Sequence, residues 1–255
     1  MTRFLVALVL ACLAAPALAW DLEPGGSGRV VEVIDGDTVV LDDGQDVRLV
    51  GMMAPKLSLG RAHVPTEPLA PEAKAALEDL VLGRRVTLWF GGNRRDRHGR
   101  TLAHLRDEDG RWVQGAMIEQ GFGRVYSFAD NRALVADMLA LERAARAARR
   151  GLWSVPEFTV RAPDEDVPLD AYMVVEGVVA DAASVNDRVY LNFGDDWRTD
   201  FTATIGRKAA TVFDEAGLDP VALEGTRVRL RGWTTYRNGP MIDLSHPEQI
   251  EVLAP

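Results

Sequence analysis

The sequence predicts a mainly β protein made of two small barrels with added helices, and three observations lead to this prediction. Short runs rich in Val, Leu, Ile and Thr recur along the 255-residue chain, separated by Gly, Asp-Gly and Asn-Gly turns. A few longer segments instead carry apolar residues at helical spacing. A proline-rich, acidic segment at 155–169 divides the chain into two parts, each long enough for its own core.

The first part contains five predicted strands and three predicted helices. Segment 31–56 reads as three strands joined by turns at Asp35-Gly36 and Asp43-Gly44, preceded by a glycine-rich lead-in at 21–28. Further strands are predicted at 85–90 and 101–106, and helices at 72–81, 112–120 and 134–150. Segment 57–71 is punctuated by Pro and Gly and is expected to be an exposed loop. Five short strands with helices placed late in the segment fit a closed barrel of the oligonucleotide/oligosaccharide-binding (OB) type.

The second part predicts a smaller OB-like β-barrel over residues 170–255. Strand-like runs occur at 173–179, 189–193, 201–205, 227–233 and 241–244, and a short helix is predicted at 207–215. Trp197, Trp233, Tyr190 and Tyr236 lie in this part, where core or partner contacts are the favoured interpretation and base stacking the alternative.

Residues 1–19 have the pattern of a secretory signal peptide. Arg3 supplies the positive start, an apolar run follows, and Ala17-Leu18-Ala19 is a small-residue cleavage site. The apolar run is too short to span a membrane, so the mature protein is expected to be exported, periplasmic or secreted, without a transmembrane segment. Cys12, the only cysteine, would be removed, which excludes disulfides and thiolate chemistry from the mature chain.

The net charge of −9 argues against a general polyanion binder, but the charge is unevenly distributed. Residues 20–160 contain 19 Lys and Arg against 21 Asp and Glu, whereas residues 161–255 contain 9 against 17. A nucleic-acid site is therefore expected in the nearly neutral first part, which also contains an arginine-rich stretch at 84–106. A solvated face is the competing interpretation of that stretch.

Segment 31–56 also carries the charges that suggest chemistry. Asp35, Asp37 and Arg48 interrupt an otherwise apolar run, and they are expected to converge at one end of the barrel. Asp35 and Asp37 alone could simply cap a turn. Cleavage of a phosphodiester requires cations placed around the phosphorus centre and a base that activates water.

The run Ile34-Asp35-Gly36-Asp37-Thr38-Val39, then Arg48-Leu49 and Pro55, then Asp96-Arg97-His98-Gly99-Arg100, resembles the motifs of the staphylococcal nuclease (thermonuclease) family. The resemblance covers about residues 28–153, so the first domain is expected at 28–154. It implies a five-stranded OB barrel with three helices. It also implies cleavage of DNA and RNA with calcium, two arginines and a glutamate, although some members of the family only bind.

Position by position, the resemblance is incomplete. Arg48 and Arg100 match the two phosphate-contacting arginines, and Asp37, with Asp35 nearby, matches the first calcium-binding aspartate. Met53 stands at the second calcium aspartate, and Lys56 stands at the catalytic glutamate, the position of the general base. A thioether is a poor ligand for Ca²⁺ or another hard divalent ion, and a protonated lysine cannot accept a proton from water.

Three functions are compatible with this pattern. The first is an exported protein that binds nucleic acid or phosphate through Arg48, Lys56 and Arg100, with nuclease activity weakened or lost. The second is an active, divalent-metal-dependent DNA/RNA endonuclease in which Glu67 or Glu72 replaces the missing base. The third is an envelope scaffold that binds protein or glycan. The pattern contains no information on the oligomeric state.

Overall fold

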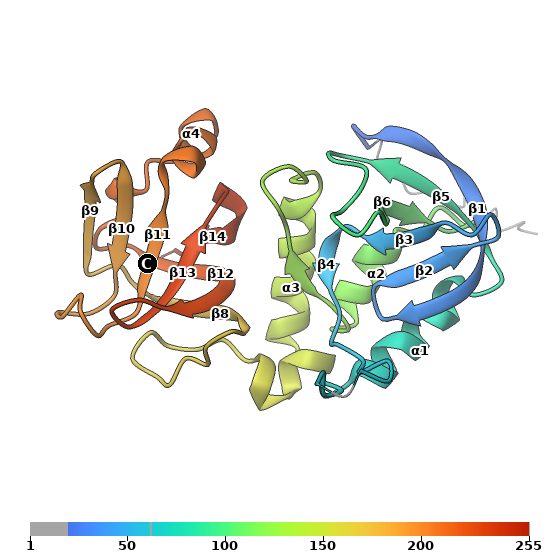
Figure 1. The fold of residues 1–255 in the computed structure, drawn as a ribbon, viewed down its shortest axis with the longest axis horizontal. Coiled ribbons are helices and arrows are strands. Elements are labelled where there is room, and N and C mark those ends of the chain that lie inside the picture. Colours follow the sequence, from blue (N-terminus) through green and yellow to red (C-terminus); the bar gives the residue numbers. More distant parts are fainter. Residues whose placement is uncertain (1–19, 62, 255) are drawn as a thin grey trace, which may run out of the picture.

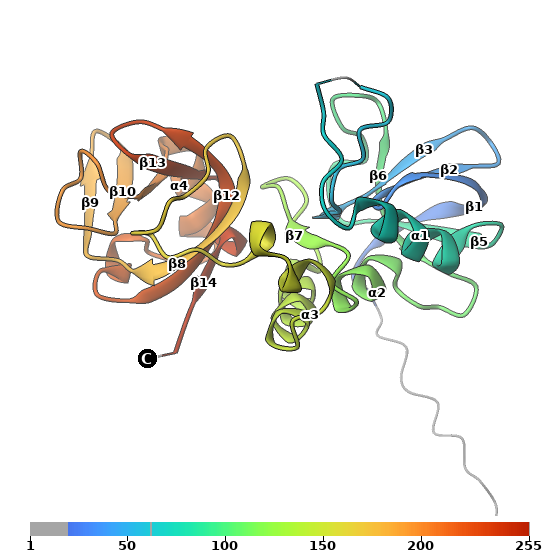
Figure 2. The same ribbon diagram turned by 90° about the horizontal axis from the view of Figure 1, so that it is seen from below.

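The structure is a computed structural model that describes residues 20–61 and 63–254. The predicted signal peptide at 1–19 lies outside the described residues. The barrel of the first part and the sheet of the second part lie on either side of helix α3 (Val135–Ala147) in both views (Figure 1, Figure 2).

The first part forms the predicted closed five-stranded barrel, in the order β1-β2-β3-β6-β5. Its strands are β1 (Glu23–Asp35), β2 (Thr38–Leu41), β3 (Asp46–Leu49), β5 (Arg85–Phe90) and β6 (Thr101–Arg106). Neighbouring strands are antiparallel except β3 and β6, which are parallel.

Most of the glycine-rich lead-in belongs to strand β1, which begins at Glu23. The first half of β1 pairs with β5 and its second half with β2, so this one bent strand closes the barrel. Gly25 is needed in this half because an added Cβ would lie 2.3 Å from the Phe90 ring. Glycine lowers strand propensity but permits the irregular register between Pro24 and Ser27.

Two very short strands escaped the sequence analysis. β4 (Gly51–Met53) and β7 (Arg124–Tyr126) pair antiparallel in a separate two-stranded sheet beside the barrel. Strands of three residues carry too few positions for a recognisable alternation. Together, β4 and β7 position side chains that face the second part of the chain.

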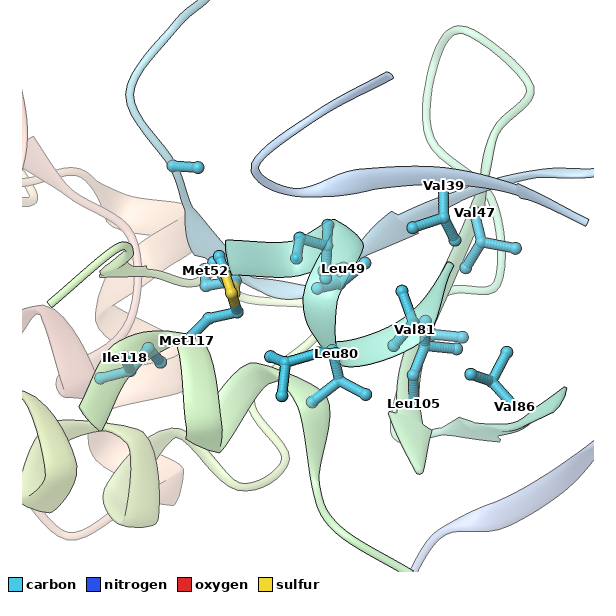
Figure 3. Packing of buried hydrophobic residues seen from close by; sticks show 14 of the residues in the cluster. Val39, Val47, Leu49, Met52, Leu80, Val81, Val86, Leu105, Met117 and Ile118 are labelled. Carbon is cyan, nitrogen blue, oxygen red and sulfur yellow. The ribbon is translucent and has the colours of Figure 1, made fainter. Parts of the chain in front are cut away.

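Helices α1 (Ala70–Val81) and α2 (Val113–Glu119) cover the barrel close to where the sequence predicts them. One buried apolar cluster joins strands and helices, and it includes Val39, Val47 and Leu105. Figure 3 shows Met52 beside Met117 and Ile118, where β4 meets α2. α3 ends at Ala147, three residues before the predicted end.

The second part contains a sheet in the order β14-β12-β13-β11-β10-β9, with β8 also paired to β12. The bounds are β8 (Tyr172–Val178), β9 (Asp181–Val185), β10 (Arg188–Asn192), β11 (Thr202–Ile205), β12 (Arg227–Tyr236), β13 (Pro240–Leu244), β14 (Ile250–Val252) and α4 (Arg207–Glu215). Strands β9 and β14 were not predicted. This sheet has its own apolar core, and its assignment as an OB-like barrel remains a prediction.

The segment predicted as a linker is packed. Short 3₁₀ turns lie just before and within this segment, at Gly151–Ser154 and Pro156–Phe158. Two more 3₁₀ turns, Val221–Leu223 and Pro247–Gln249, lie in the second part of the chain. Phe158 is buried, and Arg161 exchanges backbone hydrogen bonds with β8. The connection therefore lies against the second sheet.

A buried polar network joins the two parts of the chain. Arg231 on β12 is fully buried and forms ion pairs with Glu142 on α3 and Glu251 on β14. Tyr172 donates to the Val125 carbonyl at 2.8 Å, across the same boundary. These contacts hold β12 and β8 against α3 and β7. No helix in the described part of the chain is long and apolar enough to cross a membrane.

Candidate functional site

A pocket of about 510 Å³ lies where β3, β4 and β7 meet the loop between β5 and β6. We call it the phosphate pocket, after the phosphate contacts that the family resemblance implies for Arg48 and Arg100. Its charged and aromatic lining residues are Arg48, Arg95, Asp96, Arg97, His98, Arg100, Tyr126, Phe128 and Asp130. The pocket thus brings together the two arginines singled out in the sequence, with further arginines and two aromatic rings.

Arg48 is held at the barrel end by the turn between β1 and β2. Its side chain forms a buried ion pair with Asp37 and donates to the Met52 carbonyl at 3.3 Å. The other carboxylate oxygen of Asp37 accepts the backbone N–H of Ala54 at 2.7 Å. Asp35 accepts the backbone N–H of Asp37 at 3.1 Å, which is the turn-capping role considered above.

Arg48 is positively charged at neutral pH in this environment. The pKa of its guanidinium is lowered to about 10, chiefly by burial; the charge of Asp35 opposes this lowering, and the charge of Arg100 adds to it. A charge that is partly desolvated and already positioned interacts more strongly with an anion than one in water does.

Arg100 is positioned by Asp96 within its loop. Asp96 accepts the backbone N–H groups of His98 and Arg100 and the Arg100 guanidinium, whose Nε lies 2.7 Å away. Burial alone would raise the pKa of Asp96, but these hydrogen bonds and the charge of Arg100 lower it overall. The loop therefore presents a carboxylate-braced arginine to the pocket.

Met53 and Lys56 lie elsewhere. Both line a second pocket of about 350 Å³, shared with the second sheet, which we call the junction pocket. The Lys56 ammonium lies 4.7 Å from the centre of the Trp233 ring on β12. The structure therefore separates Lys56 from Arg48 and Arg100, with which the sequence had grouped it.

The two substitute bases are not at the phosphate pocket either. Glu67 accepts the backbone N–H of Lys56 at 2.8 Å and lines the junction pocket. Glu72 lies exposed in the first turn of α1.

The residues present do not fit the calcium ion on which nucleases of this type depend. Both oxygens of Asp37 are already engaged, by Arg48 and by the Ala54 N–H. Met53 contributes a thioether where a hard cation requires oxygen. Across residues 20–61 and 63–254 there is no group of three or more His, Cys, Asp or Glu placed to hold a metal ion.

Tyr126 and Phe128 were not predicted as site residues from the sequence. They alternate in and just after β7, and they form an edge-to-face pair with ring centres 4.8 Å apart. Aromatic residues two positions apart indicate a shared strand face, but the strand is too short to be recognised from the sequence.

A barrel of this topology with two braced arginines at its end is nuclease-like. The chain belongs to the staphylococcal nuclease family: the family described as "Staphylococcal nuclease homologue" matches residues 46–155. Protein ParB of Escherichia coli is 37% identical over 167 residues, which cover 61% of this chain and 85% of that protein.

Two further relatives have names that refer to nuclease activity. An "Uncharacterized endonuclease" of Escherichia coli is 32% identical over 155 residues, covering 60% of this chain and 90% of that protein. A thermonuclease of Staphylococcus hyicus is 26% identical over 134 residues, covering 49% and 75%.

Proposed function

We propose that the protein binds the phosphate backbone of a nucleic acid in the phosphate pocket, with hydrolysis weakened or lost. The observation that supports this proposal is that the residues at the family's active-site positions lie in two different pockets. Arg48 and Arg100 line one pocket together, whereas Met53 and Lys56, at the family's carboxylate positions, line another.

The chemistry of the pocket supports binding more than cleavage. Two guanidinium groups braced by carboxylates can each donate two hydrogen bonds to one phosphate. Tyr126 and Phe128 add ring faces on which a base can stack. The carboxylates at this pocket already have partners: Asp37 and Asp96 are engaged by the arginines themselves, and Asp130 accepts a hydrogen bond from the Asn93 side chain.

The test uses purified mature protein with labelled single-stranded DNA and RNA, in calcium, magnesium, manganese or chelator. We expect binding that weakens as salt rises, no metal-dependent cleavage, and a loss of about 10-fold to 100-fold in affinity for Arg48→Ala. Arg149→Ala, an exposed arginine after α3, is the matched control. Binding that does not respond to Arg48→Ala contradicts the proposal.

A second variant tests where the hydrolytic lesion lies. Met53→Asp combined with Lys56→Glu restores the family's two carboxylates. Cleavage gained by this double variant would show that the residues at these two positions account for the weakened hydrolysis. The single Lys56→Glu variant is the control, because one carboxylate supplies a base without completing a metal site.

An active metal-dependent endonuclease is the second candidate, and it is favoured by the endonuclease and thermonuclease names of the relatives. In this case Glu67, already near Lys56, is the base candidate. Metal-dependent cleavage by the unmodified protein that is abolished in both Arg48→Ala and Glu67→Gln would establish this function and overturn the first. If the protein neither binds nor cleaves nucleic acid, the third candidate function, an interaction scaffold for protein or glycan, becomes the favoured hypothesis.

Export is part of the same proposal, with cleavage after Ala19. The expected result is that protein recovered from the periplasm or the medium begins at Trp20 when its N-terminus is sequenced. Recovery of the full chain from the cytoplasm would contradict it.

A further inference from the structure

The junction pocket is a second cavity with ligand-binding chemistry, at the boundary between the two parts of the chain. It is bounded by the segment after β4, by β7, by the packed connection at 156–171 and by β8 and β12. Its cationic residues are Lys56, Arg124 and Arg161, and its aromatic residues are Phe158, Tyr172 and Trp233.

The three cations of this pocket form no ion pair with any residue in the described ranges. Arg124 is 5% exposed, donates to the Tyr172 carbonyl at 2.8 Å, and its Nε has no hydrogen-bond acceptor. The Nε of Arg161 also lacks an acceptor. Buried donors in native structures almost always have a partner, so both guanidinium groups keep an unused donor in the wall of the pocket.

Carboxylates balance the formal charge of the pocket. Glu67, Glu157 and Asp170 also line it, and Glu157 and Asp170 are exposed. The Glu67 carboxylate is used by the Lys56 backbone N–H. A ligand is therefore not drawn in by a long-range field, and its binding depends on close contacts with rings and donors.

A row of aromatic rings joins the two pockets. Phe128 and Tyr126 have ring centres 4.8 Å apart, Tyr126 and Tyr172 5.0 Å, and Tyr172 and Trp233 6.1 Å. Trp233 also donates to the Tyr126 hydroxyl at 3.2 Å. Phe128 in the phosphate pocket is 45% exposed and Trp233 in the junction pocket is 39% exposed, so both ends of the row are open to a ligand.

Alternating ring faces and cations are the means by which proteins hold a single strand. We propose that a single-stranded nucleic acid continues from the phosphate pocket along this row into the junction pocket. One base stacks on Trp233 and the adjoining phosphate contacts Lys56. In the structure the Lys56 ammonium lies over the Trp233 ring. Because the Lys56 side chain is long and flexible, it can move off this ring when the base stacks there and contact the phosphate instead. This inference rests on the proposed function and extends it to the second sheet.

The experiment compares a thymidine dinucleotide with an octanucleotide, both labelled, by fluorescence anisotropy in chelator. The dinucleotide fills only the phosphate pocket, whereas the octanucleotide reaches both pockets. We expect Trp233→Ala to weaken octanucleotide binding by about 5-fold to 100-fold and to leave dinucleotide binding unchanged. Trp233→Phe retains a ring and is expected to bind nearly as well as the unmodified protein, although it loses the hydrogen bond to Tyr126.

Lys56→Gln gives an independent readout. Removing one phosphate contact is expected to reduce the slope of log affinity against log salt by about 0.7 for the octanucleotide. Lys208→Gln, at an exposed position on α4, is the matched control and is expected to leave the slope unchanged.

Three outcomes would overturn the inference while leaving the proposed function intact. They are equal octanucleotide affinity in all variants, equal losses for both lengths, and a loss in Trp233→Phe as large as in Trp233→Ala. If the unmodified protein binds neither oligonucleotide, the proposed function fails and the inference fails with it.

Discussion

At the scale of single residues, the pair formed by Asp37 and Arg48 has two roles at once. Asp37 holds the arginine that faces the phosphate pocket and also accepts the Ala54 N–H, which secures the chain after β4. Because a buried carboxylate must be paired, this arrangement stabilises the fold as well as the site.

Asp37→Asn is therefore expected to destabilise the protein by about 3 kcal/mol, since the buried Arg48 loses its counter-charge. The measurement is urea unfolding followed by circular dichroism. Asp35→Asn is the comparison variant and is expected to cost less, because Asp35 is only half-buried and the Asn oxygen can still accept the Asp37 N–H, so that only the effect of its charge on Arg48 is lost. Equal unfolding midpoints for the two variants would contradict a structural role for the pair.

At the scale of elements, the turn between β1 and β2 is pressed against α1 and the chain after β4. A Cβ added at Gly36 would lie 2.6 Å from the Ala54 Cβ and 2.9 Å from the Ala73 Cβ. The small residues at these three positions let the elements approach, and their contact places Asp37 next to Ala54.

Gly36→Ala is expected to cost about 1–3 kcal/mol through overpacking, and to weaken oligonucleotide binding because Asp37 and Arg48 shift with the turn. Thermal unfolding and anisotropy measure the two effects. Gly206→Ala is a suitable control, since the nearest atom to its added Cβ is 3.5 Å away, on the Arg188 side chain. A fully stable Gly36→Ala variant would show that the turn can relax.

The contact between α3 and strands β12 and β14 depends on Arg231. Glu142 also accepts the Val125 N–H at 2.6 Å and pairs with Arg146, while Glu251 also pairs with Arg143. Nearby carboxylates raise the pKa of Arg231 despite its burial, so the charge persists in the interface.

We expect Arg231→Met to destabilise the protein by about 3 kcal/mol, because it leaves buried carboxylates with less compensation. Arg227→Met, which removes a largely exposed partner of Glu176, is expected to cost less than about 1 kcal/mol. Denaturant unfolding of both variants checks this difference. Equal stabilities would indicate that apolar packing alone holds the interface.

At the scale of the whole molecule, we expect the interface between the two parts to be sensitive to acid. His246 is fully buried, and Ser127 from the first part and Ser245 contact its two ring nitrogens at 2.7 Å and 2.9 Å. Burial lowers the pKa of His246 to about 4, the charges of Glu248 and Asp130 oppose this effect, and Arg132 adds to it. Burial also lowers the pKa of His104 in the barrel to about 4.

A depressed histidine pKa means that the unfolded chain binds a proton that the folded protein does not. Stability is therefore complete above about pH 6.5 and is expected to fall as the pH decreases from there towards about 4. Unfolding free energies measured across this range test the prediction. His246→Gln is expected to reduce the slope, with His104 accounting for part of what remains, and exposed His63→Gln is expected to leave it unchanged. A slope unaffected by His246→Gln would contradict the prediction.

Some parts of this architecture could be predicted and others could not, for identifiable reasons. The helix at 207–215 and the barrel strands at 85–90 and 101–106 are flanked by turn signals and have clear apolar periodicity, so local pattern suffices. Strand β1 was shortened in the prediction because glycines weaken the strand signal, although the barrel needs them. Strands β4 and β7 depend on each other for hydrogen bonds, and neither is visible alone.

The sequence by itself predicted the nuclease-like barrel and, through its resemblance to the family, the two arginines of the candidate site and the replacement of carboxylates at positions 53 and 56. These follow from local periodicity and from motifs that lie within short stretches. Only the tertiary structure decided that Lys56 meets Trp233 and not Arg48, and that rings from β7, β8 and β12 form one row between two pockets. Such contacts join residues that are far apart in the chain, from 46 positions for Tyr126 and Tyr172 to 177 positions for Lys56 and Trp233. They arise from packing between the two parts of the chain, on which local sequence carries no information.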